Sequence, residues 1–208
     1  NLSPNQYTAT VKDFNDCLAE IDFEIEEPDS LELLVDDQTD LLCYGDSTAT
    51  VTLSTLGGTA KFEFSVDSSA YQTDSLFEDL SAGMYTFHVK DLNECEAELS
   101  LEITQPDLLE LALVEQNIIL CTGDETGEIT LEASGGTPDF TYTLPDGTTN
   151  NDGYFSDLPA GIYEAEVEDM NQCNATIEVE VTEMAELILS VLTQTDVSCH
   201  GGNDGTVF

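Results

Sequence analysis

Hydrophobic and polar residues alternate along most of this chain with a period of two. The clearest run covers residues 95–103, where apolar residues (Cys95, Ala97, Leu99, Leu101 and Ile103) alternate with polar ones (Glu96, Glu98, Ser100 and Glu102). Successive side chains of a β-strand point to opposite faces, so this pattern predicts a strand with one buried and one solvated face. In this interpretation Cys95 faces the core. The 3.6-residue period of a helix is not found in the sequence.

Turn signals separate the alternating runs at intervals of roughly ten residues. In one full unit we expect a first strand at 31–35 with a broken continuation at 41–43, and further strands at 50–55, 62–64, 85–90 and 95–103. Gly57-Gly58-Thr59 predicts a glycine-rich turn. The segment from Val89 to Cys95 has the form Val-x-Asp-x-Asn-x-Cys. It predicts a hairpin, because Asp closes an Asx-turn and Asn tolerates the left-handed conformation.

This hairpin sequence occurs three times, at 11–17, 89–95 and 167–173, and its cysteine defines a repeat. Cys17, Cys95 and Cys173 lie 78 residues apart (95 − 17 and 173 − 95), and a second set repeats with the same interval: Cys43, Cys121 and Cys199. A constant interval indicates tandem copies of one unit.

Prolines mark the expected boundaries between units. Pro28 and Pro106 follow the last predicted strand, and a residue without an N–H ends a hydrogen-bonded ladder. We therefore expect the C-terminal part of a truncated repeat at 1–28, complete repeat 1 at 29–106, complete repeat 2 at 107–184 and the N-terminal part of a further truncated repeat at 185–208. The sequence is then expected to belong to a longer repetitive protein.

About seven short strands per unit predict an all-β fold, with tandem immunoglobulin-like antiparallel β-sandwich domains in an extended array. Each unit also has a Leu-x-x-Gly-x-Tyr sequence before a late strand, which is typical of a tyrosine corner. The three predicted corner residues are Tyr7, Tyr85 and Tyr163. The polar segments 67–79 and 145–157 differ most between units, so we expect any binding tip there. The candidate ligand contacts in them are Tyr71, Tyr154 and Phe155.

The charge is strongly one-sided, since 44 acidic residues face 3 basic ones and the formal net charge is −41. Nucleic acid and anionic membrane surfaces are excluded as partners, because binding them requires cationic residues. The expected partners are neighbouring repeats of the same chain and an external surface or polysaccharide, without direct membrane insertion. No cofactor is required. Calcium is the candidate ligand, because carboxylate oxygens suit it; the alternative is that the same side chains are simply solvated. The candidate calcium ligands are Asp36, Asp37, Asp40 and Asp46.

Six cysteines in two periodic sets predict disulfides in an oxidising compartment. Three pairings fit the spacing: within a unit, across the proline boundary, or from one unit to the next. The inward parity of Cys95 favours Cys43–Cys95 and Cys121–Cys173, with Cys17 and Cys199 pairing outside the fragment. The topology of a standard sandwich opposes this choice, because the first turn and the last hairpin lie at opposite ends.

An enzyme is not predicted. His88 and His200 are the only histidines, and His88 occupies an outward position at which the second unit has Glu166. The sequence contains no Ser/His/Asp order, phosphate loop or zinc motif.

Each unit resembles the SprB-type repeat of very large surface adhesins in gliding Bacteroidetes. In the second unit the matching elements are Cys121-Thr122-Gly123, Gly135 to Tyr142, Leu158 to Tyr163 and Val167 to Cys173, and Pro106 closes the first unit. Glu94 and Gln172 depart from the pattern, since the family has glycine after the hairpin Asn.

The resemblance implies type IX secretion, an extracellular location at the bacterial cell surface, and non-enzymatic spacer or stalk repeats in an adhesin or filament for surface attachment and gliding motility. Ser30 and Ser75, each in an Asp-Ser-Leu tripeptide, resemble O-glycan acceptors of such bacteria. Two alternatives stay open. One is a ligand-binding module for a polysaccharide or a calcium-dependent partner, and the other is a self-assembling filament or sheath subunit.

Overall fold

The computed structural model describes residues 1–208 except Ser68, which lies in the variable segment 67–79. The chain divides into two units, Asn1–Pro106 and Asp107–Phe208. The described residues form strands and turns without any helix, so the prediction of an all-β fold is confirmed. No helix that could cross a membrane is therefore found in the described part of the chain.

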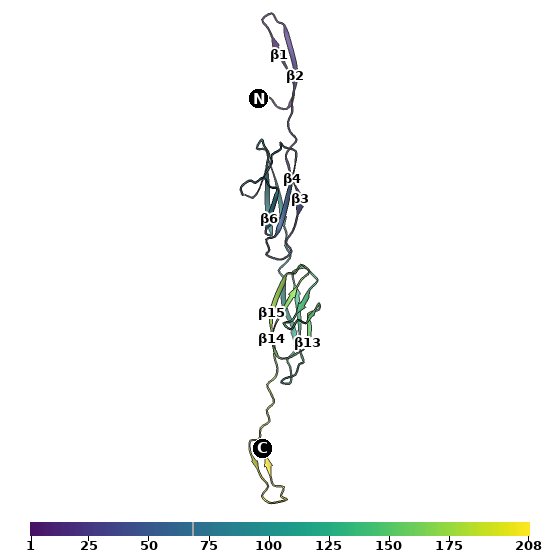
Figure 1. Cartoon of the computed structure of the whole chain (residues 1–208), viewed down its shortest axis with the longest axis vertical. Coiled ribbons are helices and arrows are strands. Elements are labelled where there is room, and N and C mark those ends of the chain that lie inside the picture. The colour runs from purple at the N-terminus through teal and green to yellow at the C-terminus, as the bar shows by residue number, and fades with distance from the viewer. Residues whose placement is uncertain (68) are drawn as a thin grey trace. The chain divides into compact units, whose positions relative to one another are not determined.

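The first unit contains a two-stranded hairpin and a sandwich (Figure 1). In the hairpin, β1 (Asn5–Lys12) pairs antiparallel with β2 (Leu18–Ile25). One sheet of the sandwich has the order β3-β4-β6, with bounds Glu32–Gln38, Ala49–Leu56 and Leu76–Leu80. The other sheet has the order β5-β7-β8, with bounds Glu63–Val66, Gly83–Lys90 and Glu96–Ile103.

The second unit repeats this topology. One sheet has the order β13-β10-β9, with bounds Tyr154–Leu158, Gly127–Ser134 and Glu110–Gln116. The other has the order β12-β11-β14-β15, with bounds Thr149–Asn150, Thr141–Thr143, Gly161–Glu168 and Asn174–Val181. A separate pair, β16 (Gln194–Thr195) and β17 (Thr206–Val207), follows in the sequence. Two antiparallel sheets in this strand order form an immunoglobulin-like sandwich, as predicted.

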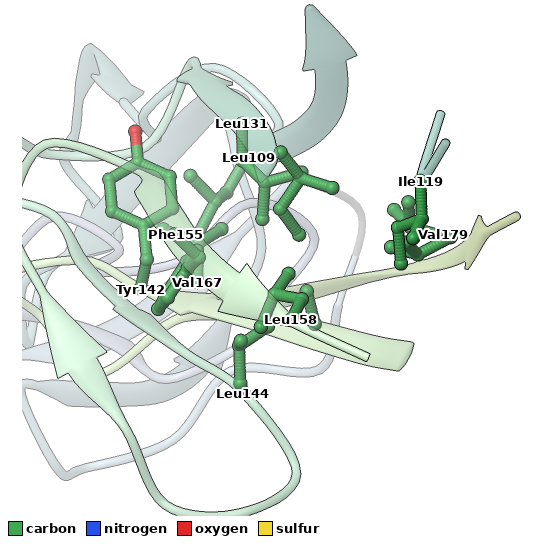
Figure 2. Packing of buried hydrophobic residues seen from close by; sticks show 12 residues of the cluster. Leu109, Ile119, Leu131, Tyr142, Leu144, Phe155, Leu158, Val167 and Val179 are labelled. Carbon is green, nitrogen blue, oxygen red and sulfur yellow. The ribbon is translucent and has the colours of Figure 1, made fainter. Parts of the chain in front are cut away.

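The core of each sandwich consists of the inward positions of the alternating runs. In the first unit Phe77 of β6 meets Phe87 of β7 edge to face, with ring centroids 5.1 Å apart, so the two sheets pack against each other. Figure 2 shows the equivalent cluster of the second unit, where Tyr142, Phe155, Leu158 and Val167 converge. Burial of these side chains drives the folding of each unit by itself.

Two details of the predicted strands are wrong. Residues 41–43 do not continue the first strand, because β3 ends at Gln38 and a loop follows. Cys95 does not face the core, because β8 begins only at Glu96 and Cys95 is an exposed turn residue. Strand parity holds only within the ladder, and the hairpin turn already includes Cys95.

After its first strand, each unit crosses to the last strand of the opposite sheet. In the first unit the amide of Leu41, a buried residue, donates to the carbonyl of Thr104 at 3.0 Å. In the second unit Ile119 donates to Thr182 at 3.0 Å, and Met184 donates back to Ile119 at 2.9 Å. Ile119 and Glu183 form a parallel bridge. The beginning and the end of each sandwich are therefore tied together side by side.

Candidate functional site

The repeated hairpin is closed by its aspartate, as the sequence predicts. In the first copy the Asp13 carboxylate accepts the amides of Asn15 at 2.7 Å and Cys17 at 2.9 Å. Asp91 and Asp169 make the corresponding pairs of bonds. The left-handed residue, however, is the one after the Asn: Asp16, Glu94 and Gln172 have φ of 63°, 62° and 67°. The expectation that the Asn takes this conformation is wrong. In the two complete repeats the Asn side chain instead donates a hydrogen bond to the threonine of the Gly-Gly-Thr turn.

In both complete repeats the hairpin aspartate is buried and also accepts the glycine-rich turn. Asp91 is 5% exposed and its second oxygen accepts the amide of Thr59 at 2.9 Å. The Asn93 amide donates to the Thr59 hydroxyl at 2.9 Å, and the Leu92 amide donates to the Thr59 carbonyl at 3.2 Å. We call this arrangement of aspartate, hairpin and Gly-Gly-Thr turn the carboxylate clamp.

The second repeat reproduces the clamp. Asp169 is 4% exposed and accepts the amide of Thr137 at 2.7 Å. The Asn171 side chain donates to the Thr137 hydroxyl at 3.0 Å. The two best sequence motifs of the unit, 32 residues apart, are thus a single structural feature.

Both glycines of the Gly-Gly-Thr turn are required by close packing. Gly135 has φ of +73°, and a Cβ on it would lie 1.9 Å from the carbonyl oxygen of Leu108. Gly136 donates its amide to the carbonyl of Asp107 at 2.9 Å. A Cβ on Gly136 would lie 2.8 Å from the Asp169 carboxylate. The clamp therefore holds the start of each sandwich as well as its last hairpin.

Hydrogen bonding stabilises the charged forms of Asp91 and Asp13. The backbone amide of Thr59, followed by those of Cys95 and Asn93, lowers the pKa of Asp91 against the opposing effect of burial. The amides of Cys17 and Asn15 lower the pKa of Asp13 in the same way. A carboxylate that needs its charge to accept backbone amides serves the fold and is unsuited to accepting a proton in catalysis.

The tyrosine hydroxyl bonds back to the backbone in both Leu-x-x-Gly-x-Tyr sequences and also at Tyr7, where Asn5 stands in place of the glycine. Tyr7 donates to the carbonyl of Ser3 at 2.7 Å, Tyr85 to that of Ser81 at 3.1 Å, and Tyr163 to that of Pro159 at 2.8 Å. Each acceptor lies four residues before its tyrosine. This is the geometry of a tyrosine corner.

The calcium candidates are not gathered into a site. Asp40 accepts the amide of Thr104 at 2.8 Å, which lowers its pKa, and it also accepts the Gln38 side chain at 3.2 Å. Asp36 and Asp37 lie at a bulge of β3, and Asp46 lies in the following turn. Outside Ser68, no three His, Cys, Asp or Glu side chains are grouped so as to hold a metal ion. The hydrogen bonds of Asp40 instead hold the crossover of the first repeat against the end of its last strand.

The favoured cysteine pairs, Cys43–Cys95 and Cys121–Cys173, are not formed. Cys95 and Cys121 are exposed thiols, as are Cys17 and Cys199. Cys43 and Cys173 are disulfide-bonded. The physical reason lies within one repeat: Cys43 follows the crossover at the end of β8, whereas Cys95 precedes the start of that strand. Eight residues of strand separate the two ends by about 26 Å, far more than a disulfide spans.

Two other candidates have local partners. The Nδ1 atom of His88 lies 3.9 Å from the carboxylate of Glu98 on the neighbouring strand. Tyr71 is covered by the ammonium group of Lys90, 4.4 Å from its ring centroid, and Lys90 also pairs with Glu96 at 3.2 Å. One face of the Tyr71 ring is therefore occupied by Lys90.

The two remaining aromatic candidates differ from each other. Phe155 is buried in the core and is excluded as a ligand contact. Tyr154 is 45% exposed on the outer face of β13, beside a groove lined by Glu115, Gln116, Asn117, Glu128, Thr130 and Tyr154 itself. Ser30 is exposed just before β3, and Ser75 is partly exposed just before β6.

The sandwich topology, the clamp and the tyrosine corner define a protein of tandem immunoglobulin-like repeats. Residues 35–70 and 117–149 match the model of the SprB repeat. The resemblance derived from the sequence motifs is confirmed over these two stretches. They include the crossover segments and the Gly-Gly-Thr turns but not the last hairpins.

Several solved structures of multidomain proteins are similar to this chain over part of their length. A 282-residue C-terminal fragment of intimin, in complex with the intimin-binding domain of its translocated receptor, is 14% identical with a TM-score of 0.41, covering 73% of this chain and 63% of that chain. Three N-terminal domains of the bacteriophage RB49 outer capsid protein Hoc are 12% identical with a TM-score of 0.43, covering 74% and 59%. Eight N-terminal Ig domains of Down Syndrome Cell Adhesion Molecule are 13% identical with a TM-score of 0.43, covering 86% and 28%.

The chain spans less than two thirds of each of these proteins. At such identities and scores the likeness carries no functional argument. No curated protein matches the chain.

Proposed function

We propose that these repeats are non-enzymatic, load-bearing spacers of a large secreted adhesin or filament at a bacterial cell surface. The proposal includes the finer parts that the SprB resemblance implies, namely type IX secretion, a role in surface attachment and gliding, and O-glycans on Ser30 and Ser75. The SprB match supports the class of protein, and the way in which each sandwich is tied together supports the mechanical role.

The observation that carries this proposal is the parallel pairing between the beginning and the end of a repeat. Ile119 and Glu183 form a parallel bridge, with hydrogen bonds from Ile119 to Thr182 and from Met184 to Ile119. The chain enters the second repeat beside Gly136 and leaves it beside Ile119, at opposite ends of the sandwich. Tension on the two ends therefore loads these bonds in shear, all at once, rather than peeling them apart one by one.

At the other end of the sandwich, where the chain enters the repeat, the carboxylate clamp resists the same tension. The carbonyl of Asp107, at the entry of the second repeat, accepts the amide of Gly136, and Thr137 next to it is bound by the buried Asp169. A chain pulled at Asp107 is thus held by a turn that is itself fixed to the last hairpin. This arrangement suits a domain that transmits force without opening.

The surface suits a spacer as well. With a net charge of −41, like-charged repeats stay soluble and do not collapse onto one another at low ionic strength. The glutamates of β8 and β15 all lie at exposed positions, so their charges are on the outer surface of the sandwiches.

An exchange experiment in the producing cell tests the proposal. Residues 29–184 are replaced in the whole protein by two unrelated β-sandwich domains, and attachment of cells to their surface is measured under flow. A spacer role predicts unchanged attachment as long as two stable domains are present. Loss of attachment with normal display of the protein would show that the repeats themselves adhere, and would overturn the proposal.

A further inference from the structure

The second repeat has a groove on the outer face of its β13-β10-β9 sheet that the fold does not require. Its volume is about 110 Å³. Six residues from all three strands and the segment after β9 line it: Glu115, Gln116, Asn117, Glu128, Thr130 and Tyr154. None of them belongs to the core, which lies on the opposite face of this sheet.

The strand register places the key side chains next to one another. Thr130 on the central strand is paired with Glu115 on one side and with Tyr154 on the other. The Glu128 carboxylate beside the Tyr154 hydroxyl raises the pKa of Tyr154. The tyrosine ring is therefore held in the groove, still 45% exposed, with a carboxylate at its polar end.

The rim of the groove is also fixed. The Glu128 amide donates to the Asn117 side-chain oxygen at 2.7 Å, and the Asn117 side-chain nitrogen donates to the carbonyl of Thr126 at 3.1 Å. These bonds hold the segment after β9 against β10. A polar groove whose walls are already in place loses little conformational freedom when a ligand binds.

The first repeat lacks two of the side chains that line this groove, although it has the same fold. One period earlier, Leu76 stands in place of Tyr154 and Thr50 in place of Glu128, while the register of Thr52 with Asp37 and Leu76 is unchanged. The aromatic ring and its carboxylate are thus specific to the second repeat and are not needed to build the sandwich.

We propose that this groove binds one sugar ring that carries no negative charge, with the Tyr154 ring as the stacking surface and the Glu115 and Glu128 carboxylates as acceptors for its hydroxyl or ammonium groups. A flat ring next to fixed acceptors matches the apolar face and the hydroxyl edge of a pyranose. Two carboxylates in a chain of charge −41 repel an acidic sugar. This binding role goes beyond the spacer function and does not depend on it.

NMR titration of the whole chain tests the proposal, with glucosamine, N-acetylglucosamine and glucuronic acid as separate probes. We expect glucosamine and N-acetylglucosamine to shift the amide signals of Thr130 and Tyr154 with dissociation constants of about 1 mM or weaker, the range of a shallow site. The equivalent signals of Thr52 and Leu76 in the first repeat should not move. Glucuronic acid should shift neither set.

Two variants sharpen the test. Tyr154→Leu copies the residue of the first repeat, so the fold is retained, and it should weaken binding about tenfold or more. The pair Thr50→Glu and Leu76→Tyr should transfer binding to the first repeat, whereas Thr50→Glu alone should not.

Three results would overturn the proposal. Equal shifts in both repeats would mean diffuse attraction to an acidic surface, and equal shifts with glucuronic acid would mean that the carboxylates do not face the ligand. The absence of any shift at Thr130 and Tyr154 with the two uncharged or cationic sugars would mean that the groove binds no sugar.

Discussion

Replacing Asp169 with alanine removes the acceptor at the centre of the carboxylate clamp in the second repeat. The side chain is 4% exposed and accepts three backbone amides, from Thr137 at 2.7 Å, Asn171 at 2.8 Å and Cys173 at 3.0 Å. All three hydrogen bonds are partly buried. Loss of these charge-assisted bonds should cost about 3 kcal/mol of the free energy of unfolding.

Differential scanning calorimetry of the whole chain measures this loss. A change of about 3 kcal/mol lowers the melting temperature of a domain of this size by about 12 to 24 °C. The transition of the first repeat should stay where it is, which provides an internal reference. Asp152→Ala is the matched control, since the Asp152 carboxylate accepts a single exposed amide, that of Tyr154 at 3.2 Å, and its loss should change stability by about 0.5 kcal/mol or less.

The reasoning fails if Asp169→Ala lowers the melting temperature no further than the control does. Such a result would mean that the Gly-Gly-Thr turn and the hairpin hold their places by packing alone, and that burial of the aspartate follows from the fold without supporting it.

Three further predictions concern the same turns. Asp91→Asn should destabilise the first repeat near neutral pH but not in acid. Because the pKa of Asp91 is lowered in the folded state, the carboxylate's contribution to stability is complete above its ordinary pKa of 3.8 and is lost as the pH falls through the folded-state pKa. Urea titrations of the original protein and of the variant should therefore give the same stability below the folded-state pKa. Gly135→Ala should cost about 3 kcal/mol or more in thermal unfolding because a Cβ meets the Leu108 carbonyl, whereas Gly147→Ala, with φ of +88° and open space, should cost only about 1 kcal/mol; equal losses would contradict the packing argument. Gln172→Gly should raise stability by about 0.5 to 1 kcal/mol in chemical denaturation because Gln172 has φ of 67°, and a loss of stability would show that its side chain contributes more than its backbone strain costs.

The alternation of apolar and polar residues predicts the buried faces of β4 and β7, but it does not predict β6 and β13, which lie in the segments expected to be variable connections. Val51 and Leu53 are buried on β4 as their parity indicates, and Phe87 and Val89 are buried on β7. The constant interval between the cysteines identifies equivalent positions in the two repeats, and the contact of the buried aspartate with the Gly-Gly-Thr turn recurs at those positions. These features depend on local sequence, which is why sequence alone reveals them.

The carboxylate clamp could not be predicted, because its parts are 32 residues apart and each has an ordinary local explanation. Asp91 was expected to close a turn, and Gly57-Gly58-Thr59 to form one. Nothing in the composition of a chain with 44 acidic residues marks one aspartate as buried. The signal that could have been used is the joint recurrence of both motifs at a fixed separation in each unit.

The prediction of the cysteine pairs was wrong for a related reason. A shift of one residue at the start of β8 moved Cys95 from the core face into the turn, and the parity argument for a partner in the same core was lost with it. The crossover at Leu41 was also missed, since a short apolar segment does not reveal which of two sheets it joins.

Stretching single molecules by their two ends tests the central claim, a load-bearing spacer, most directly. Met184 donates a hydrogen bond to Ile119, whereas the equivalent residue of the first repeat is Pro106, which has no amide to donate. We therefore predict that the second repeat opens at the higher force, and that Met184→Pro accelerates its opening about fivefold at a fixed force while the first repeat is unaffected. Opening at low force, with no response to Met184→Pro, would contradict the claim that the parallel bridge carries the load.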